Sequence, residues 1–261
     1  MDRPIALVVA LAQERRPLQR LLAAARHGRV EECRLVVGGL AGRSAVLIQV
    51  GIGRDRARRA LLAAAHRYPF RAAWSLGFAG GLAETLCAGD VVCPAAVLLD
   101  DGRTGQSFGV APAQAAVCAA LAAAGIRIHD GPLLTVDDPL RTPEVKRAAH
   151  RRTGAVAVDM EAAGVAEAAR DLGIPWLAIK AVVDAAGEAL PEFLAGCTTA
   201  QGELRWRGLL RGLASGGCRR TLWRLHRASG QAARGLQRAL DVAFAAWSMG
   251  APAIDPAARR G

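Results

Sequence analysis

The chain has 261 residues, of which 52% are hydrophobic and only 4% are aromatic. This composition suits one large α/β domain with a sizeable core, and no apolar run is long enough to span a bilayer. The first residues lead into a strand-like run without a secretory cleavage site, and the six cysteines form no C-x-x-C pair and lie near no histidine cluster. We therefore expect a cytoplasmic protein with reduced thiols, no metal site and no cofactor.

The net charge of +11 is concentrated towards the C-terminus. Residues 201–261 hold eleven arginines against three acidic residues, which leaves only a small positive charge on the first 200 residues. The overall charge is therefore a weak argument for nucleic-acid binding, and we expect no nucleic-acid partner. The change in composition divides the chain into a catalytic domain, 1–200, and an arginine-rich helical extension, 201–261.

Strand-like and helical patterns alternate along the first 190 residues, and helical patterns follow. We expect strands at 5–10, 35–37, 45–50, 72–76, 133–136, 155–158 and 176–183, an extended segment at 91–99, and helices at 14–26, 54–66, 113–124, 143–151, 203–213, 219–227 and 231–247. Residues 38–42 join a hairpin, and the glycine-rich run 77–81 ends a strand. The alternation predicts a three-layer α/β/α sandwich with a mixed, parallel-rich central sheet, plus a C-terminal helical extension.

Acidic residues stand where two of the expected strands end. The run 155–158 leads into Asp159-Met160-Glu161, and the run 176–183 leads into Asp184. Ligands bind at the carboxyl ends of strands in parallel α/β sheets, so Glu161 and Asp184 are expected at one cleft. Glycines at 51, 53 and 77–81 would let the backbone approach a ligand. Taken singly, each glycine cluster is equally typical of a turn, and Asp159 of a helix cap.

In this order and spacing, the motifs resemble the nucleoside phosphorylase and methylthioadenosine/S-adenosylhomocysteine nucleosidase superfamily over roughly residues 4–190. The matching runs are Ala10–Glu14, Gly51–Gly53, Gly77–Leu82, Gly89–Val92, Val158–Ala162 and Lys180–Asp184. Within that superfamily, the runs 131–137, 143–147 and 184–191 are most similar to hopanoid-associated phosphorylases.

The resemblance implies an enzyme that cleaves the N-glycosidic bond of a 5′-modified adenine nucleoside, expected to be adenosylhopane, and releases adenine. It assigns three catalytic acids: Glu161 to hold the ribose hydroxyls, Asp184 to protonate the purine N7, and Glu14 to activate water. The N7 role requires a raised pKa for Asp184, which burial can provide. The implied substrate-binding residues are Met160, Phe78, Ala79, Gly80, Asp159 and Val183.

Several questions stay open at the level of sequence. Phosphorolysis would need inorganic phosphate as a co-substrate, with Arg54 as a candidate ligand, whereas Glu14 favours hydrolysis. Phe78 and Val183 replace hydroxyl residues of the family pattern, which makes the pocket less polar and favours a lipid-tailed nucleoside. Lys180 stands where an arginine is common in the family. The alternatives are a nucleosidase for a small substrate, of the methylthioadenosine, S-adenosylhomocysteine or futalosine type, and a non-catalytic lipid-surface scaffold.

The arginine-rich extension has two interpretations. Basic amphipathic helices with tryptophans, such as Trp206 and Trp223, can lie on an anionic membrane, here as a peripheral contact at the inner membrane face. Alternatively, their apolar faces pack on the domain or on a neighbouring subunit. The family resemblance also implies a homo-oligomer.

Overall fold

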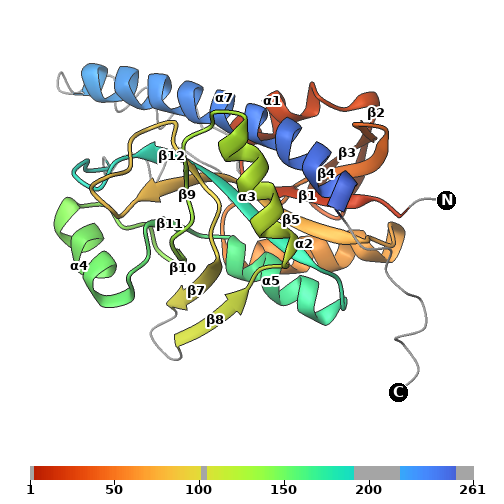
Figure 1. The fold of residues 1–261 in the computed structure, drawn as a ribbon, viewed down its shortest axis with the longest axis horizontal. Coiled ribbons are helices and arrows are strands. Elements are labelled where there is room, and N and C mark those ends of the chain that lie inside the picture. Colours follow the sequence, from red (N-terminus) through yellow and green to blue (C-terminus); the bar gives the residue numbers. More distant parts are fainter. Residues whose placement is uncertain (1–2, 101–104, 191–217, 251–261) are drawn as a thin grey trace.

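The computed structural model describes residues 3–100, 105–190 and 218–250 (Figure 1). The strands are β1 (Ile5–Val9), β2 (Ala23–Val30), β3 (Cys33–Leu40), β4 (Arg43–Gln49), β5 (Ala72–Gly81), β6 (Val91–Val92), β7 (Ala96–Asp100), β8 (Gly105–Gly109), β9 (Ile128–His129), β10 (Leu133–Val136), β11 (Ala157–Asp159) and β12 (Trp176–Asp184). The helices are α1 (Ala12–Gln19), α2 (Arg54–Arg67), α3 (Ala113–Ala123), α4 (Pro143–Thr153), α5 (Ala162–Asp171) and α7 (Cys218–Gly250).

Strand β5 is the centre of one mixed sheet. The order is β2-β3-β4-β1-β5-β11-β10-β7-β8, and β12 pairs with β5 and β6. β5 runs parallel to β1 and β12, and its last glycines pair antiparallel with β11. β11 and β12 therefore run in opposite directions on the two sides of β5, and not parallel to each other as was expected for the two acidic strand ends. Their acidic ends still lie close together, because Val158 of β11 and Asp184 of β12 both pair with Gly80.

Helices cover both faces of the sheet, which confirms the predicted three-layer sandwich (Figure 1). Along β1, Ile5, Leu7 and Val9 enter the core beneath α1, α3 and α7, whereas Ala6 and Val8 enter the core beneath α2 and α5. Successive side chains thus enter the cores on opposite faces of the sheet, as expected for a strand that is buried on both faces.

Helix α7 packs on the domain. Its residues Leu236, Leu240, Phe244 and Trp247 are buried, and the ring centroid of Trp74 on β5 lies 5.5 Å from that of Phe244. From Ala228 to Trp247 the apolar face of α7 thus belongs to the domain core. The side chains of residues 205–223, which include Trp206 and Trp223, lie outside the described part of the chain. No helix in the described ranges is long and apolar enough to cross a membrane.

The C-terminal helix α7 is continuous from Cys218 to Gly250. The separation of 219–227 from 231–247 is wrong, because the helix continues through Gly230, where an added Cβ would meet only the end of the Arg234 side chain. Glycine lowers helix stability without breaking a helix that tertiary packing supports. The predicted helix at 203–213 and the boundary at residue 200 lie outside the described residues.

The predicted helix at 14–26 is also wrong in its second half. α1 ends at Gln19, and the alanine-rich run that follows belongs to β2, which pairs antiparallel with β3. A Cβ on Gly38 would lie 2.8 Å from the carbonyl oxygen of Ala23, so this glycine allows the two strands to approach. Tertiary pairing thus overrides the helix propensity of alanine.

The glycine-rich run 77–81, which was expected to end a strand, is itself the last part of β5, because it pairs with β12 and β11. The alternative of a turn is therefore wrong. The predicted hairpin is confirmed with longer strands and a tight turn at Ala41-Gly42, where both φ angles are positive. Proline 94 divides the extended segment 91–99 into β6 and β7. The other predicted elements within the described ranges agree with the structure to within a few residues.

Candidate active site

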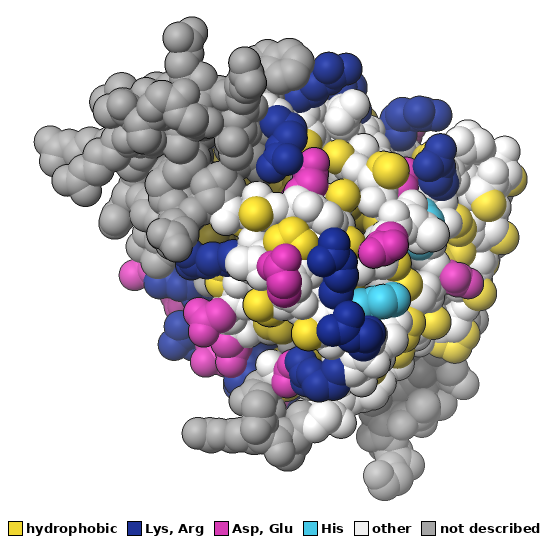
Figure 2. All heavy atoms as spheres, turned by 90° about the vertical axis from the view of Figure 1, so that its left-hand side faces the viewer, with side chains coloured by type: hydrophobic (Ala, Val, Ile, Leu, Met, Phe, Trp, Pro, Cys, Tyr) yellow, Lys and Arg dark blue, Asp and Glu magenta, His cyan; other side chains and the backbone are white. Residues whose placement is uncertain are grey.

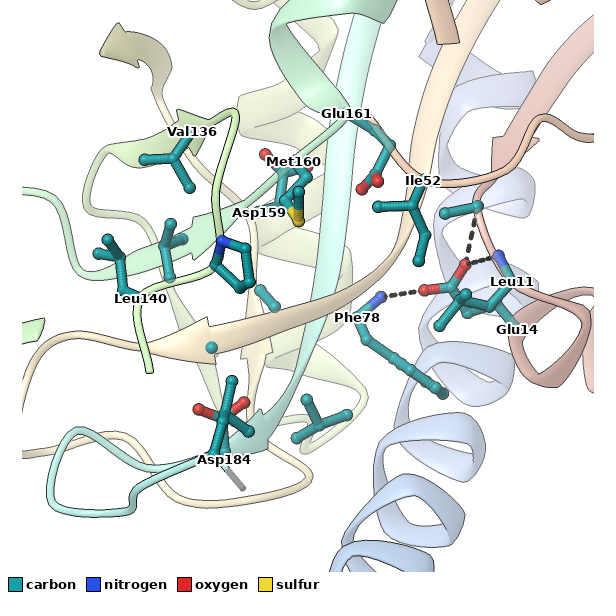
Figure 3. A pocket seen from close by; sticks show the side chains of 17 residues that line it. Leu11, Glu14, Ile52, Phe78, Val136, Leu140, Asp159, Met160, Glu161 and Asp184 are labelled. Carbon is teal, nitrogen blue, oxygen red and sulfur yellow. Dashed lines mark hydrogen bonds between the residues drawn. The ribbon is translucent and has the colours of Figure 1, made fainter. Parts of the chain in front are cut away.

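A cavity of about 170 Å³ lies at the ends of β5, β11 and β12 (Figure 3). All nine residues that the sequence predicts for the site line it: Glu14, Phe78, Ala79, Gly80, Asp159, Met160, Glu161, Val183 and Asp184. The remaining lining residues are mostly apolar: Ala10, Leu11, Ile52, Val136, Pro139, Leu140, Val158 and Leu190. The fold therefore brings the predicted site residues together around one cavity, although their chemical roles stay predictions.

Glu14 is buried at the start of α1 and is held entirely by backbone donors. Its Oε2 accepts the N–H groups of Ala10 and Leu11, each at 2.8 Å, and its Oε1 accepts the N–H of Phe78 at 2.7 Å. Burial raises the pKa of the Glu14 carboxyl, and the hydrogen bonds together with the charge of Lys180 oppose that rise. Three N–H donors favour the carboxylate form, which a water-activating base requires.

Gly77 makes this arrangement possible. Its φ is +140°, and a Cβ built there would lie 2.7 Å from Glu14 Oε1. A side chain at this position would therefore displace the carboxylate from the Phe78 N–H. The glycine lets the backbone of β5 approach Glu14 closely.

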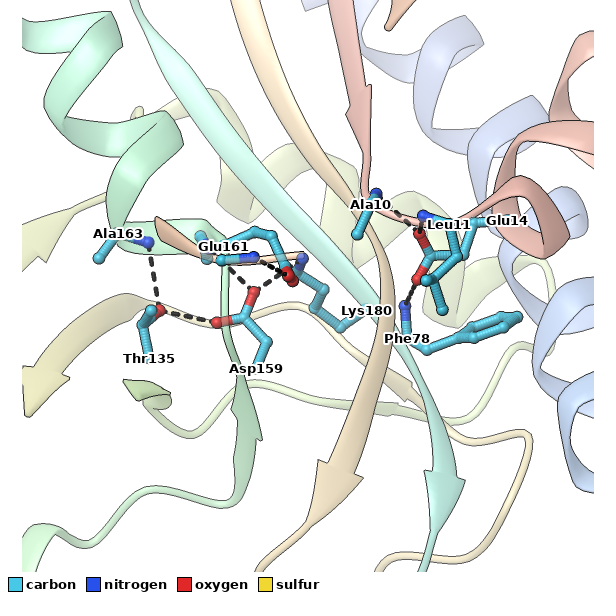
Figure 4. A network of polar contacts seen from close by, with 11 residues as sticks. Ala10, Leu11, Glu14, Phe78, Thr135, Asp159, Glu161, Ala163 and Lys180 are labelled. Atoms are coloured by element: carbon cyan, nitrogen blue, oxygen red, sulfur yellow. Dashed lines mark hydrogen bonds and ion pairs between the residues drawn. The ribbon is translucent and has the colours of Figure 1, made fainter. Parts of the chain in front are cut away.

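A second carboxylate cluster stands across the cavity (Figure 4). Asp159 pairs with the buried Lys180 at 2.8 Å and accepts a 2.7 Å hydrogen bond from the hydroxyl of Thr135. Its Oδ2 also accepts the N–H of Ala162 at 2.9 Å, so it caps the first turn of α5. Both oxygens of Asp159 are thus engaged with protein donors.

Glu161 is the member of this cluster that is free to face a ligand. Its Oε1 accepts the N–H of Gly53 at 2.9 Å. Burial, followed by the charge of Asp159, raises the pKa of Glu161 to about 8, and Lys180 offsets part of the rise. Burial alone would lower the pKa of Lys180, but the adjacent Asp159 and Glu161 raise it overall, so its ammonium remains charged.

Asp184 occupies another side of the cavity, at the end of β12 (Figure 3). Its carboxylate forms a buried ion pair with Lys146 of α4. Burial raises the pKa of the Asp184 carboxyl, and the Lys146 ammonium opposes that rise. A Cβ on Gly80 would lie only 3.2 Å from Asp184 Oδ2, so the absence of a side chain there leaves room for the carboxylate.

The aromatic ring of Phe78 points towards α7 (Figure 3). Phe78 and Val183 are partly buried and pack against the core that contains α7. Both residues also line the cavity, so this side of the site is apolar, as their replacement of hydroxyl residues predicts.

The candidate phosphate ligand Arg54 does not line the cavity. Its guanidinium lies 3.9 Å from Glu167 of α5 and 3.5 Å from Asp55. No Lys, Arg or His is among the described residues that line the cavity. In residues 3–100, 105–190 and 218–250, no group of His, Cys, Asp and Glu side chains could hold a metal ion.

Sequence reasoning missed two residues that support the site, Thr135 and Lys146. Thr135 lies in the run 131–137 and Lys146 in the run 143–147, and both runs indicate only the family resemblance. A buried Lys180 had a visible signal, because it interrupts an otherwise apolar strand. Lys146 had none, since it stands among other charged residues on an amphipathic helix.

Known proteins are similar to this chain in sequence and in fold. The chain is 28% identical to the 5′-methylthioadenosine/S-adenosylhomocysteine nucleosidase of Anoxybacillus flavithermus over 203 residues, which cover 70% of this chain and 86% of that protein. The nucleosidase of the same name from Bacillus cereus is 30% identical, with 70% of this chain and 87% of that protein covered.

Solved structures share the fold at lower identity. The 5′-methylthioadenosine/S-adenosylhomocysteine nucleosidase of Colwellia psychrerythraea, in complex with adenine, aligns with a TM-score of 0.75 and 20% identity over 94% of this chain and 96% of that chain. The futalosine hydrolase of Helicobacter pylori aligns with a TM-score of 0.74 and 14% identity over 93% of this chain and 97% of that chain. The family model of the phosphorylase superfamily matches residues 4–204. Because this match spans most of the chain, the protein belongs to the phosphorylase superfamily.

Proposed function

We propose that the protein hydrolyses the N-glycosidic bond of a 5′-modified adenine nucleoside and releases adenine. The observation that carries this proposal is the convergence of Glu14, Glu161 and Asp184 on one cavity whose other walls are largely apolar. The names of the two sequence relatives reported above, both 5′-methylthioadenosine/S-adenosylhomocysteine nucleosidases, support the reaction class.

Each carboxyl group meets one demand of this reaction. As the C1′–N9 bond breaks, positive charge develops on the ribose, and the Glu161 carboxylate both stabilises it and accepts hydrogen bonds from the ribose hydroxyls. Asp184 delivers a proton to N7, so that the base leaves as neutral adenine. Glu14 accepts a proton from the water that attacks C1′. Met160 lines the cavity beside Glu161 and would contact the sugar face.

The same site favours water over phosphate as the attacking group. The backbone N–H groups that could cradle an anion are already donated to carboxylates, three to Glu14 and one to Glu161. A phosphate dianion there would be repelled by both carboxylates, and no described cation lines the cavity to offset that repulsion.

The apolar walls support a nonpolar 5′ substituent, and we propose the lipid-tailed nucleoside adenosylhopane as the substrate. Phe78, Val183 and Leu190 provide the apolar surface that such a group would contact. A substrate of this kind would be collected from a membrane, and the tryptophan- and arginine-rich residues 205–223 are the candidates for a peripheral contact. The second candidate function, cleavage of methylthioadenosine or S-adenosylhomocysteine, is favoured by the names of the relatives.

A panel of adenine nucleosides tests the proposal. Wild-type protein is incubated with adenosine, methylthioadenosine, S-adenosylhomocysteine and a nucleoside with a long 5′-alkyl group, while free adenine is measured. We expect adenine release that is fastest with the long alkyl group and falls by at least about 100-fold in Glu161→Gln. Fastest turnover of methylthioadenosine would select the second candidate. Absence of adenine release from all four would favour the non-catalytic scaffold.

A further inference from the structure

Lys146 is an unusual residue on its helix. Glu144, Arg151 and Arg152 of α4 are exposed. Basic and acidic side chains intermingle on the face of the molecule that Figure 2 shows. The side chain of Lys146 is 0% exposed and points instead into the protein, behind Asp184. A buried ammonium is costly unless it is paired and hydrogen-bonded, so its placement requires an explanation.

All three donors of the Lys146 ammonium are used. Besides the ion pair with Asp184, its Nζ donates to the carbonyl oxygens of Ala185 at 2.8 Å and Glu188 at 2.9 Å. These acceptors belong to the segment directly after β12. The lysine therefore fixes both the Asp184 carboxylate and the backbone that carries it.

Two further charged side chains of the described residues, Glu188 and Arg224, affect the pKa of Asp184. Glu188 follows β12, and Arg224 of α7 lies 3.3 Å from the Glu188 carboxylate. These two groups act on Asp184 in opposite directions, the first raising and the second lowering the pKa of its carboxyl. Among the charges that act on the pKa of Asp184, Lys146 has the largest effect, and it opposes the rise that burial causes.

This pairing conflicts with a simple acid role for Asp184. Burial raises the pKa of the Asp184 carboxyl, but in the ion pair with Lys146 the carboxylate is ionised. In that form it has no proton to give, although the proposed function requires Asp184 to protonate N7. The Lys146 ammonium, which donates a hydrogen bond to the Asp184 carboxylate, carries the proton that the reaction needs.

We propose that Lys146 is a positioning residue that holds Asp184 against the leaving purine and supplies the proton that Asp184 passes to N7. This rests on the proposed function. When the C1′–N9 bond breaks, its electron pair moves into the purine. The Asp184 carboxylate takes a proton from Lys146, which becomes a neutral amine, and passes this proton to N7, so that Asp184 is again a carboxylate. The water oxygen bonds to C1′ and loses a proton to Glu14. After adenine leaves, Glu14 returns its proton to solvent and Lys146 takes one back.

Two substrates separate proton supply from structural support. The adenine nucleoside needs a proton at N7, whereas a p-nitrophenyl riboside with the same 5′ group has a leaving group that needs none. In Lys146→Gln we expect kcat for the adenine nucleoside to fall by at least about 100-fold and kcat for the nitrophenyl riboside by less than about fivefold. The alkaline limb of the adenine pH profile should also move to lower pH. Parallel losses with the two substrates would overturn the proposal.

Lys146→Arg is the second variant. Arginine keeps the positive charge and the pairing but does not release its proton at accessible pH. We expect selective loss with the adenine nucleoside again, whereas full activity would show that the charge alone suffices and would overturn the proposal. Arg147→Gln is the matched control, since Arg147 is the next residue on α4 and pairs with the exposed Glu84 at the surface. Both activities should stay within about twofold there.

A spectroscopic measurement does not depend on the folding of the Lys146 variants. The infrared difference spectrum between wild type and Asp184→Asn at neutral pH should show an ionised carboxylate for Asp184. A protonated carboxyl band would overturn the proposal, because Asp184 would then carry its own proton. If wild-type enzyme cleaves no adenine nucleoside, the proposed function fails. If it cleaves them but the Lys146 variants affect the two substrates equally, only the role of Lys146 fails.

Discussion

The carboxylate of Glu14 accepts the backbone N–H of Phe78 at 2.7 Å, which joins the start of α1 to the last part of β5. With the N–H groups of Ala10 and Leu11, this contact places a buried negative charge where an anion-binding pocket would otherwise form. The protein thus supplies its own anion at this position, which suits the activation of a neutral water molecule.

Replacing Glu14 tests that role. Glu14→Gln keeps the size of the side chain but removes the base, so we expect adenine release to fall by at least about 100-fold with little change in KM. Steady-state kinetics of adenine release measure this. Glu84→Gln, at an exposed position, is the control. A loss of less than about tenfold would show that another group activates the nucleophile.

The pKa of Glu161, raised to about 8, predicts the acid limb of the pH profile. Glu161 must be ionised to stabilise the cationic ribose, so kcat/KM should rise as the pH increases through about 8. The measurement is kcat/KM between pH 5 and 9.5 for the wild type and for Glu161→Gln. We expect a sigmoidal rise in the former and low, flat values in the latter. An acid limb close to the ordinary pKa of a glutamate would contradict the assignment.

The same burial predicts how stability depends on pH. Burial raises the pKa values of Glu14, Glu161 and Asp184 in the folded state, so this state binds more protons than the unfolded chain. The stabilisation from protonation is complete below the unfolded pKa values and is lost as the pH rises through the folded ones. The free energy of unfolding of the ligand-free protein should therefore decrease between about pH 5 and pH 9, at about 1.4 kcal/mol for each unit of pKa shift.

Urea unfolding at several pH values measures this dependence. Glu161→Gln should show a flatter curve than wild type, because its amide does not titrate. Glu84→Gln should keep the wild-type slope. Identical slopes for Glu161→Gln and wild type would mean that Glu161 is not perturbed in the folded state.

The packing of α7 gives a prediction about stability alone. Phe244 is 0% exposed and contacts Trp74 on the central strand. Phe244→Ala should lower the free energy of unfolding by about 3 to 5 kcal/mol. Ala245→Ser, at the next, exposed position, should change it by less than about 0.5 kcal/mol. Equal stabilities would contradict the assignment of α7 to the core.

The main parts of the site could be predicted from sequence because the chemistry interrupts a strong pattern. Asp184 and Glu161 follow apolar strands, and a carboxylate at such a position is visible without coordinates. Lys180 is visible for the same reason. Lys146 is different, because which polar residue of an amphipathic helix turns inwards depends on the neighbouring segment, here residues 184–188.

The fold was less predictable where long-range contacts override local propensity. Residues 23–25 are all alanine and favour a helix, yet pairing with β3 makes them strand. Similarly, the glycines after Leu76 are typical of a turn, but they are extended because β12 and β11 flank them. For α7, a basic amphipathic pattern is the same whether its apolar face meets lipid or protein, and only the tertiary contacts with Trp74 distinguish the two.

The most direct test of the account is the fate of the attacking oxygen. Wild-type enzyme cleaves an adenine nucleoside in phosphate-free buffer made with oxygen-18 water, and the sugar product is examined by mass spectrometry. We predict free adenine and a sugar that carries one oxygen-18 at C1′, at a rate that added phosphate does not increase. Adenine release only when phosphate is present, with formation of a sugar 1-phosphate, would contradict the central claim.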